Sequence, residues 1–144
     1  IALQWKHINS YVHFEQAVTF SEEGLTLKKG LKTQEKRRFP INQQLSNILN
    51  AIKPEDCSTE DYLFPSPEGK FIDFNNFRNR AWKSILTKCG IPYRKLYQTR
   101  HTFITLCLEA GIDAKDVARL VGNSPEVIYR HYAGNKRNLQ VPEL

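Results

Sequence analysis

The stretch RLVGNSPEVIYRHYAG, residues 119–134, contains side chains whose types and spacing could do chemistry. Two short apolar segments meet at a Gly-Asn-Ser-Pro break, and a Tyr-Arg-His-Tyr cluster follows the second segment. A break between two helical segments is typical of a helix–turn–helix that reads DNA. The same break could position a reactive tyrosine, because a phenol hydroxyl is one of the groups that form covalent intermediates in catalysis. Other parts of the chain have to distinguish these two interpretations.

Two more clusters stand out. One is the segment 96–103, which contains Tyr97, Arg100 and His101. The other is the basic segment 28–37, KKGLKTQEKR, in which five of ten residues are Lys or Arg. The formal net charge of the chain is +6, from 21 Lys and Arg against 15 Asp and Glu. This balance favours a polyanionic partner.

In order, spacing and flanking apolar pattern, the three clusters resemble the catalytic domain of the tyrosine site-specific recombinases, the phage integrase family. That family has the pattern H-x-x-R-H-T-F, then L-G-H-S, and then a tyrosine eight residues after the serine. The matching text here is YQTRHTF at 97–103, VGNS at 121–124, and Tyr132 eight residues after Ser124. Leu31-Lys32-Thr33, with Arg38-Phe39-Pro40, is similar to the lysine-bearing β-hairpin of the family. The resemblance runs from Leu3 to about Gly134.

The resemblance implies site-specific DNA recombination by strand breakage and rejoining, as in DNA integration and excision. A tyrosine hydroxyl attacks a DNA phosphodiester in line, forms a 3′-phosphotyrosyl link and releases a 5′-hydroxyl. The covalent link stores the bond energy, so no ATP, metal or other cofactor is expected. Fixed cationic donors must then stabilise the charged phosphorane, and guanidinium suits this role because it is planar, bidentate and always charged.

The match assigns a role to each residue. Tyr132 would be the nucleophile, Arg100 would bind the scissile phosphate, and Lys32 would protonate the leaving 5′-oxygen or stabilise its charge. Tyr97 and Asn123 occupy two positions at which the family has histidine. Both can donate a hydrogen bond, but the Asn123 amide cannot carry positive charge or shuttle protons. The remaining basic residues of segment 28–37 are expected to contact DNA: Lys28, Lys29, Lys36 and Arg37.

Three of these assignments have rivals. Tyr129 is the competing nucleophile, although its spacing from Ser124 fits the family less well. Lys28, Lys29 and Lys36 are neighbours that compete with Lys32. The histidine of the family lies three residues before the arginine, whereas His101 follows Arg100 directly. We therefore expect His101 to be a packed helical residue and not a catalyst.

The alternative function is a DNA-binding module of the helix–turn–helix type with no chemistry. Residues 113–121 would form its first helix and residues 125–132 its recognition helix. That recognition helix would present Pro125, Glu126 and Val127 at its N-terminal end, where base-reading side chains belong. An acidic residue facing phosphates opposes binding, so the reactive tyrosine is favoured.

A type IB topoisomerase shares the phosphotyrosyl chemistry, but the compact domain lies closer to the integrases.

The elements that must position these residues are a small antiparallel sheet followed by about five helices. Strands are predicted at 11–14, 17–20, 25–27 and 38–41, with residues 28–37 as a basic hairpin tip. Helical spacing of apolar residues follows, first in 45–52 and then in 74–86. Further inward faces are predicted for Phe103, Leu106, Cys107 and Ala110, and for Val117, Leu120 and Val121. Pro54, Gly111 and Gly122 should end helices, and Asp113 and Ser124 should cap them.

The expected fold class is α+β, mostly helical, with no βαβ alternation. Residues 1–144 are predicted to be one catalytic domain, truncated at its N-terminus. In the family, the first catalytic arginine lies upstream of the position that Trp5 matches. An upstream arginine-bearing helix and a core-binding domain would then be absent, and the fragment itself would be weakly active or inactive.

The expected partners are double-stranded DNA and further copies of the chain, in a tetramer on DNA. The tail 135–144, with Leu139, Val141 and Leu144, could pack on a neighbouring copy. No apolar run approaches the roughly 20 residues of a membrane span, so a cytoplasmic, nucleoid-associated protein is expected. The three cysteines are too scattered for a zinc site and are expected to be buried or idle thiols: Cys57, Cys89 and Cys107.

Overall fold

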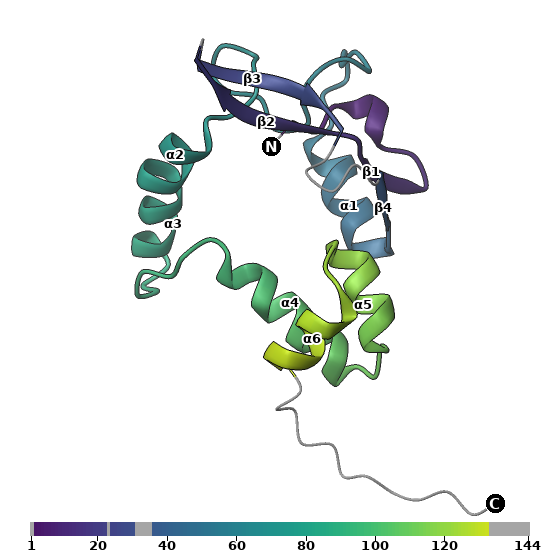
Figure 1. The fold of residues 1–144 in the computed structure, drawn as a ribbon. Helices are drawn as coiled ribbons and strands as arrows, with labels where there is room; N and C mark the ends of the chain where they lie inside the picture. Colours follow the sequence, from purple (N-terminus) through teal and green to yellow (C-terminus); the bar gives the residue numbers. More distant parts are fainter. Residues whose placement is uncertain (1, 23, 31–35, 133–144) are drawn as a thin grey trace, which may run out of the picture. The chain divides into compact units, whose positions relative to one another are not determined.

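The structure is a computed structural model that describes residues 2–22, 24–30 and 36–132 (Figure 1). Lys32 and the tail 135–144 therefore lie outside the described residues. The chain divides into two compact units, Ile1–Tyr93 and Arg94–Leu144. Of the described elements, four strands lie in the first unit and three helices form the second. The prediction of a single catalytic domain over 1–144 stays a prediction.

The strands form two antiparallel pairs. Strand β1 (Tyr11–Phe14) pairs with β4 (Arg37–Pro40), and β2 (Gln16–Ser21) pairs with β3 (Gly24–Lys29). The predicted strand positions are confirmed to within a few residues. A tight turn closes the second pair, in which Ser21 lies opposite Gly24. Gly24 has a φ of 104°, a value that glycine adopts readily because it has no Cβ.

The predicted pairing of the last two strands is wrong. Among the residues that the structure describes, β3 and β4 pair with β2 and β1 respectively, and not with each other. The physical reason is the short β2–β3 turn, which brings β3 back along β2 in register. The described ends of segment 28–37 therefore belong to two different strand pairs. The Gly30 N–H donates to the Glu15 carbonyl at 2.7 Å at the end of β3, and Arg37 of β4 lies opposite Phe14.

The helices of the first unit pack on a small core. A turn of 3₁₀ helix, η1 (Trp5–His7), precedes the strands, and α1 (Gln43–Ile52) follows them. Asn42 caps α1 by accepting the Leu45 N–H at 2.9 Å, and the helix ends before Pro54, as predicted. A longer helix follows, made of α2 (Phe74–Asn76), the π-helical η2 (Phe77–Trp82) and α3 (Lys83–Lys88). The core consists of Trp5, Leu49 and Leu63, flanked by Leu3, Ile8, Ile41, Leu45 and Cys57.

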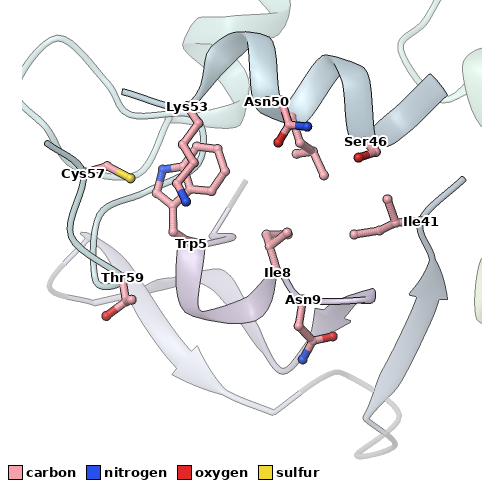
Figure 2. Close-up of a pocket in the computed structure, with 10 residues that line it drawn as sticks. Trp5, Ile8, Asn9, Ile41, Ser46, Asn50, Lys53, Cys57 and Thr59 are labelled. Atoms are coloured by element: carbon pink, nitrogen blue, oxygen red, sulfur yellow. The ribbon is translucent and has the colours of Figure 1, made fainter. Parts of the chain in front are cut away.

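A pocket of about 280 Å³ lies in the first unit between η1, α1 and the loop after α1 (Figure 2). Lys53 lines one side of the pocket, and its ammonium group lies 5.6 Å from the centroid of the Trp5 ring. The pocket is lined by Trp5, Ile8, Asn9, Ile41, Ser46, Leu49, Asn50, Lys53, Cys57 and Thr59.

The apolar stripes predicted for the first unit are only partly buried in it. Leu49 on α1 is 6% exposed, whereas its neighbour Ile48 is 51% exposed. On α3, Leu86 is buried and Ile85 is exposed. A periodic pattern specifies which face of a helix is apolar, but it does not specify how much of that face the same unit covers.

The second unit consists of α4 (Gln98–Glu109), α5 (Ala114–Val121) and α6 (Pro125–Tyr132), drawn in green to yellow in Figure 1. The predicted caps are confirmed. Asp113 caps α5 by accepting the Lys115 N–H at 2.8 Å, and the Ser124 Oγ caps α6 by accepting the Val127 N–H at 3.4 Å. Gly122 ends α5 in the left-handed conformation, with φ 65°. The core of this unit is formed by Ile104, Cys107, Ala114, Val117, Ala118, Val121 and Ile128.

The inward face predicted for α4 is partly wrong. Cys107 is buried as expected, but Leu106 is 58% exposed and Ala110 is exposed as well. Ile104 takes the central place instead, because it lies one turn from Cys107 on the face that packs in the core with α5 and α6. Among the cysteines, Cys107 is buried, Cys57 is partly buried and Cys89 is exposed; all three are free thiols.

In the described ranges, every helix is too short or too polar to cross a membrane.

Candidate active site

The first turn of α4 presents three polar side chains on one face. Tyr97 is the residue before the helix, and its carbonyl accepts the N–H groups of Arg100 at 3.1 Å and His101 at 3.4 Å. Residues three and four positions apart are neighbours on a helix surface, so these side chains meet. The Arg100 guanidinium lies 5.8 Å from the Tyr97 ring centroid, and the Tyr97 and His101 rings lie edge to face at 5.1 Å.

Tyr132, the last residue of α6, lies against this turn. Its hydroxyl is hydrogen-bonded to the Nδ1 atom of His101, and the two ring centroids are 5.5 Å apart. The Tyr132 ring is half-buried and also packs on the core of the unit. The turn at Gly122 and the Ser124 cap reverse the chain between α5 and α6. This reversal brings a hydroxyl at the end of α6 to side chains 31 residues earlier in the sequence.

Arg100 is held by the end of α5. Its Nη1 donates to the carbonyl of Val121, the last residue of α5, at 2.7 Å. Its Nε is buried, and within the described ranges no acceptor bonds to it. Among those residues, no carboxylate forms an ion pair with Arg100 either. A guanidinium has five N–H groups, so Arg100 is fixed in place and keeps donors for an anion.

The surroundings of Tyr132 keep its hydroxyl protonated. Burial raises the pKa of Tyr132 above its ordinary value, and the nearby Tyr97 phenol raises it further. The charge of Arg100 lowers the pKa of Tyr132, but it does not reverse the shift. A nucleophilic Tyr132 must therefore lose its proton during the attack rather than before it.

Asn123 lies on the connection between α5 and α6, two residues after the carbonyl that binds Arg100. Its backbone N–H donates to the Ala118 carbonyl at 2.9 Å, and its Oδ1 accepts the Ser124 N–H at 3.1 Å. Because the side-chain oxygen is used in the turn, the NH₂ group of the amide is the part that Asn123 can offer to a ligand.

The basic segment belongs to the first unit. Lys28 on β3 is exposed, and Lys36 forms an exposed ion pair with Glu15 at 3.6 Å. Arg37 on β4 is half-buried, with its guanidinium 4.6 Å from the Phe14 ring centroid. The backbone of Lys29 pairs with Gln16. Lys32 lies outside the described residues, so the structure brings together Tyr97, Arg100 and Tyr132 and does not test the lysine.

The expectation for His101 is confirmed only in part. The residue is helical and its ring packs against the Tyr97 and Tyr132 rings, but its side chain is exposed and contacts the hydroxyl of the predicted nucleophile. The sequence contained a signal that could have found it. His101 lies four residues after Tyr97, so the helical spacing that groups Tyr97 with Arg100 includes His101 as well.

Curated relatives share part of this sequence, although no family model matches the chain. A tyrosine recombinase XerC-like protein of Caldanaerobacter subterraneus subsp. tengcongensis is 40% identical over 63 residues, 44% of this chain and 16% of the relative. An integrase of Saccharopolyspora erythraea is 32% identical over 97 residues, 62% of this chain and 22% of the relative. Tyrosine recombinase XerC of Staphylococcus aureus is 28% identical over 114 residues, 76% of this chain and 37% of the relative.

Among solved structures, the Tn1549 transposon integrase in complex with circular intermediate DNA has the same fold. The TM-score is 0.75 at 16% identity, over 94% of this chain and 50% of that chain. A structure of the same integrase with transposon right end DNA gives a TM-score of 0.68 at 17% identity, over 94% and 47% of the two chains. The chain thus spans half or less of the proteins that it matches.

The likeness to the integrase confirms the predicted α+β, mostly helical fold with a small antiparallel sheet near the N-terminus. The matches in sequence carry the names recombinase and integrase independently of the fold. In sequence, this chain is similar to tyrosine recombinases and integrases over part of their length, and it shares the fold of the Tn1549 integrase.

Proposed function

We propose that this protein catalyses site-specific DNA recombination through a 3′-phosphotyrosyl intermediate formed on Tyr132. The observation that carries the proposal is the contact of the Tyr132 hydroxyl with His101 in the first turn of α4. In the same turn, the charge of Arg100 lowers the pKa of Tyr132. The phenol oxygen attacks a DNA phosphorus, the bond to the 5′-oxygen breaks, and a 5′-hydroxyl is released. Attack by another 5′-hydroxyl reverses the step and joins the new strands.

Arg100 stabilises the negative charge that the phosphorane gathers. The support is its anchoring by Val121, its buried Nε and the absence of a carboxylate partner among the described residues. A donor fixed before the reaction costs no reorganisation when the charge develops. The Tyr97 hydroxyl and the Asn123 NH₂ group supply further hydrogen bonds to the non-bridging oxygens.

Duplex DNA is the proposed substrate, and the basic segment 28–37 supplies phosphate contacts. The Tn1549 structures, whose fold this chain shares, are complexes with DNA. Lys32 is the proposed donor of a proton to the leaving 5′-oxygen. Lys28, Lys29, Lys36 and Arg37 are proposed to bind the backbone, and such contacts make the affinity fall as salt rises.

Recombination also requires more than one copy of the chain, because one tyrosine cleaves one strand at a time and rejoining uses a 5′-hydroxyl from another strand. We therefore propose assembly as a tetramer on DNA, with the tail 135–144 packing on a neighbour. Association with the nucleoid follows from the DNA substrate.

The second candidate function is a non-catalytic helix–turn–helix, with α5 and α6 as its two helices. The geometry of α6 opposes it. A hydrogen bond from the Ser124 side chain lowers the pKa of Glu126, so an ionised carboxylate stands at the start of the helix that would enter the groove.

Tyr129, the rival nucleophile, is exposed, and across the described residues no hydrogen bond or ring contact joins it to α4.

Covalent capture of DNA tests the proposal. The chain is incubated with nicked duplexes of randomised sequence, in which the cleaved end diffuses away and traps the enzyme. We expect an adduct that resists detergent and maps to Tyr132 by peptide mass. Tyr132→Phe should abolish the adduct and leave DNA binding intact, whereas the matched control Tyr129→Phe should change neither.

Two other results are possible. Salt-sensitive DNA binding with no adduct would favour the non-catalytic module. An adduct that persists in Tyr132→Phe and disappears in Tyr129→Phe would move the nucleophile to Tyr129.

A further inference from the structure

We propose that His101 is the general base of this active site, taking the proton of the Tyr132 hydroxyl at Nδ1 as the tyrosine attacks DNA. The inference rests on the proposed function and assigns a role to a residue outside the matched set Tyr97, Arg100, Asn123 and Tyr132. It is carried by one contact, the hydrogen bond between the Tyr132 hydroxyl and the His101 ring. A general base has to lie within hydrogen-bond reach of the proton that it takes.

The His101 ring is held in this orientation from two sides. The Tyr97 ring packs against it edge to face at 5.1 Å, from the preceding turn of α4. The Tyr132 ring lies 5.5 Å away at a tilt of 33°, from the end of α6. The Nδ1 atom therefore meets the hydroxyl by packing as well as by the hydrogen bond itself.

The chemistry of the neighbouring groups leaves His101 as the proton acceptor. Burial raises the pKa of Tyr132, so the attack needs a base. The charged and titratable groups that surround the pair are Tyr97 and Arg100 on α4, and Arg94 just before it. A phenol and two guanidinium groups are poor proton acceptors near neutral pH, whereas a neutral imidazole accepts a proton readily.

The step balances in atoms and charge. The Oη–H bond of Tyr132 breaks as Nδ1–H forms on His101, and the Oη–P bond forms as the bond from phosphorus to the 5′-oxygen breaks. The leaving oxygen takes its proton from a separate donor, for which Lys32 is the candidate. On rejoining, His101 returns its proton to the departing phenolate of Tyr132.

The surface position of His101 suits this role. The side chain is exposed and lines a shallow pocket on α4 together with Arg94, Gln98, Thr102, Thr105 and Leu106. Its ring is thus within reach of a substrate bound from the solvent side.

The test compares two substitutions at position 101 in single-turnover adduct formation. In His101→Asn, the side-chain amide can still bond to the Tyr132 hydroxyl, but it cannot take up a proton at neutral pH. His101→Ala removes both functions. We expect both variants to form the adduct about 100-fold more slowly or worse, as for loss of a general base. The matched control is His131→Asn, an exposed histidine next to Tyr132 on α6, which should leave the rate unchanged.

The leaving group sharpens the result. A substrate with sulfur in place of the bridging 5′-oxygen has a leaving group that needs no proton. It should not rescue the His101 variants, because their defect lies on the nucleophile.

Each outcome bears on one claim. An adduct in the wild type together with a normal rate in His101→Asn would overturn the general base and leave the recombinase intact, with His101 as a positioning residue. If the wild type gives no adduct, the nitrogen spectrum of labelled histidine still decides the contact. We expect neutral His101 to carry its proton on Nε2, and we expect its nitrogen signals to shift in the Tyr132→Phe variant. A neutral ring protonated at Nδ1 would overturn the proposal.

Discussion

The two basic regions of this chain differ in how firmly their cations are held. Arg100 is fixed by a hydrogen bond of 2.7 Å to the Val121 backbone carbonyl, and its guanidinium lies beside the Tyr97 ring. Lys36 is 76% exposed, and its bond to Glu15 is a long ion pair at the surface. Exposed pairs of this kind contribute little to stability. Under the proposed function, the difference fits two tasks: a guanidinium that must meet one phosphate in one geometry, and lysine charges that need only be near a DNA backbone.

The strongest way to break this comparison is to alter Arg100. Arg100→Ala should remove roughly 3–4 kcal/mol of transition-state stabilisation, a loss of about 10² to 10³ in the rate of adduct formation. Arg100→Lys keeps the charge but loses the planar fork, so we expect a defect of similar size. Single-turnover capture on nicked duplexes measures both rates. If Arg100→Lys reacted as fast as the wild type, charge alone would suffice, and the contrast with Lys36 would disappear.

Helix ends and their caps could be predicted from the sequence because they depend on local chemistry. Asp113, Gly122 and Ser124 each act within a few residues of their own position, and the structure confirms all three. Strand pairing was not predictable in the same way. Whether β4 meets β1 or β3 depends on the register that a short turn sets elsewhere in the sheet.

The candidate site divides along the same line. Tyr132 and Arg100 follow from a spacing that resembles the family, and the fold brings α4 and α6 together as the family match implies. The contact of His101 with the Tyr132 hydroxyl depends on side-chain packing between helices that are far apart in sequence. Helical spacing alone shows that His101 shares a face with Tyr97, but it does not show what that face meets.

The rigid side of the comparison depends on the core beneath α4. Ile104 is fully buried, so Ile104→Ala should lower the free energy of unfolding of the second unit by about 2–5 kcal/mol. Leu106→Ala, on the exposed face of the same helix, should cost well under 1 kcal/mol. Thermal unfolding together with hydrogen exchange in α4 measures both changes. Equal losses would mean that Leu106 is covered in solution.

A smaller effect is expected at the start of α6, which carries Tyr132, the proposed nucleophile, at its other end. Ser124→Ala removes the oxygen that accepts the Val127 N–H, and loss of such a cap costs about 1 kcal/mol. Ser124→Asp should keep most of the stability, because aspartate is also a good N-cap. If fraying of α6 loosens Tyr132, adduct formation should fall in Ser124→Ala and recover in Ser124→Asp. An unchanged rate of adduct formation in Ser124→Ala would show that the packing of Ile128 is enough to hold α6 in place.

The smallest change in folding is expected where the cation is held least. Lys36→Gln breaks an exposed ion pair with Glu15, so the free energy of unfolding should change by less than about 0.5 kcal/mol. Its effect should appear in DNA binding instead. Losing one phosphate contact lowers the slope of log affinity against log salt by about 1, whatever the DNA sequence. Titrations at several salt concentrations measure that slope, with Lys53→Gln, a lysine packed over Trp5 in the pocket of the first unit, as the control. An unchanged slope in Lys36→Gln would mean that Lys36 pairs with Glu15 and does not contact a DNA phosphate. The phosphate contacts would then come from other residues of segment 28–37.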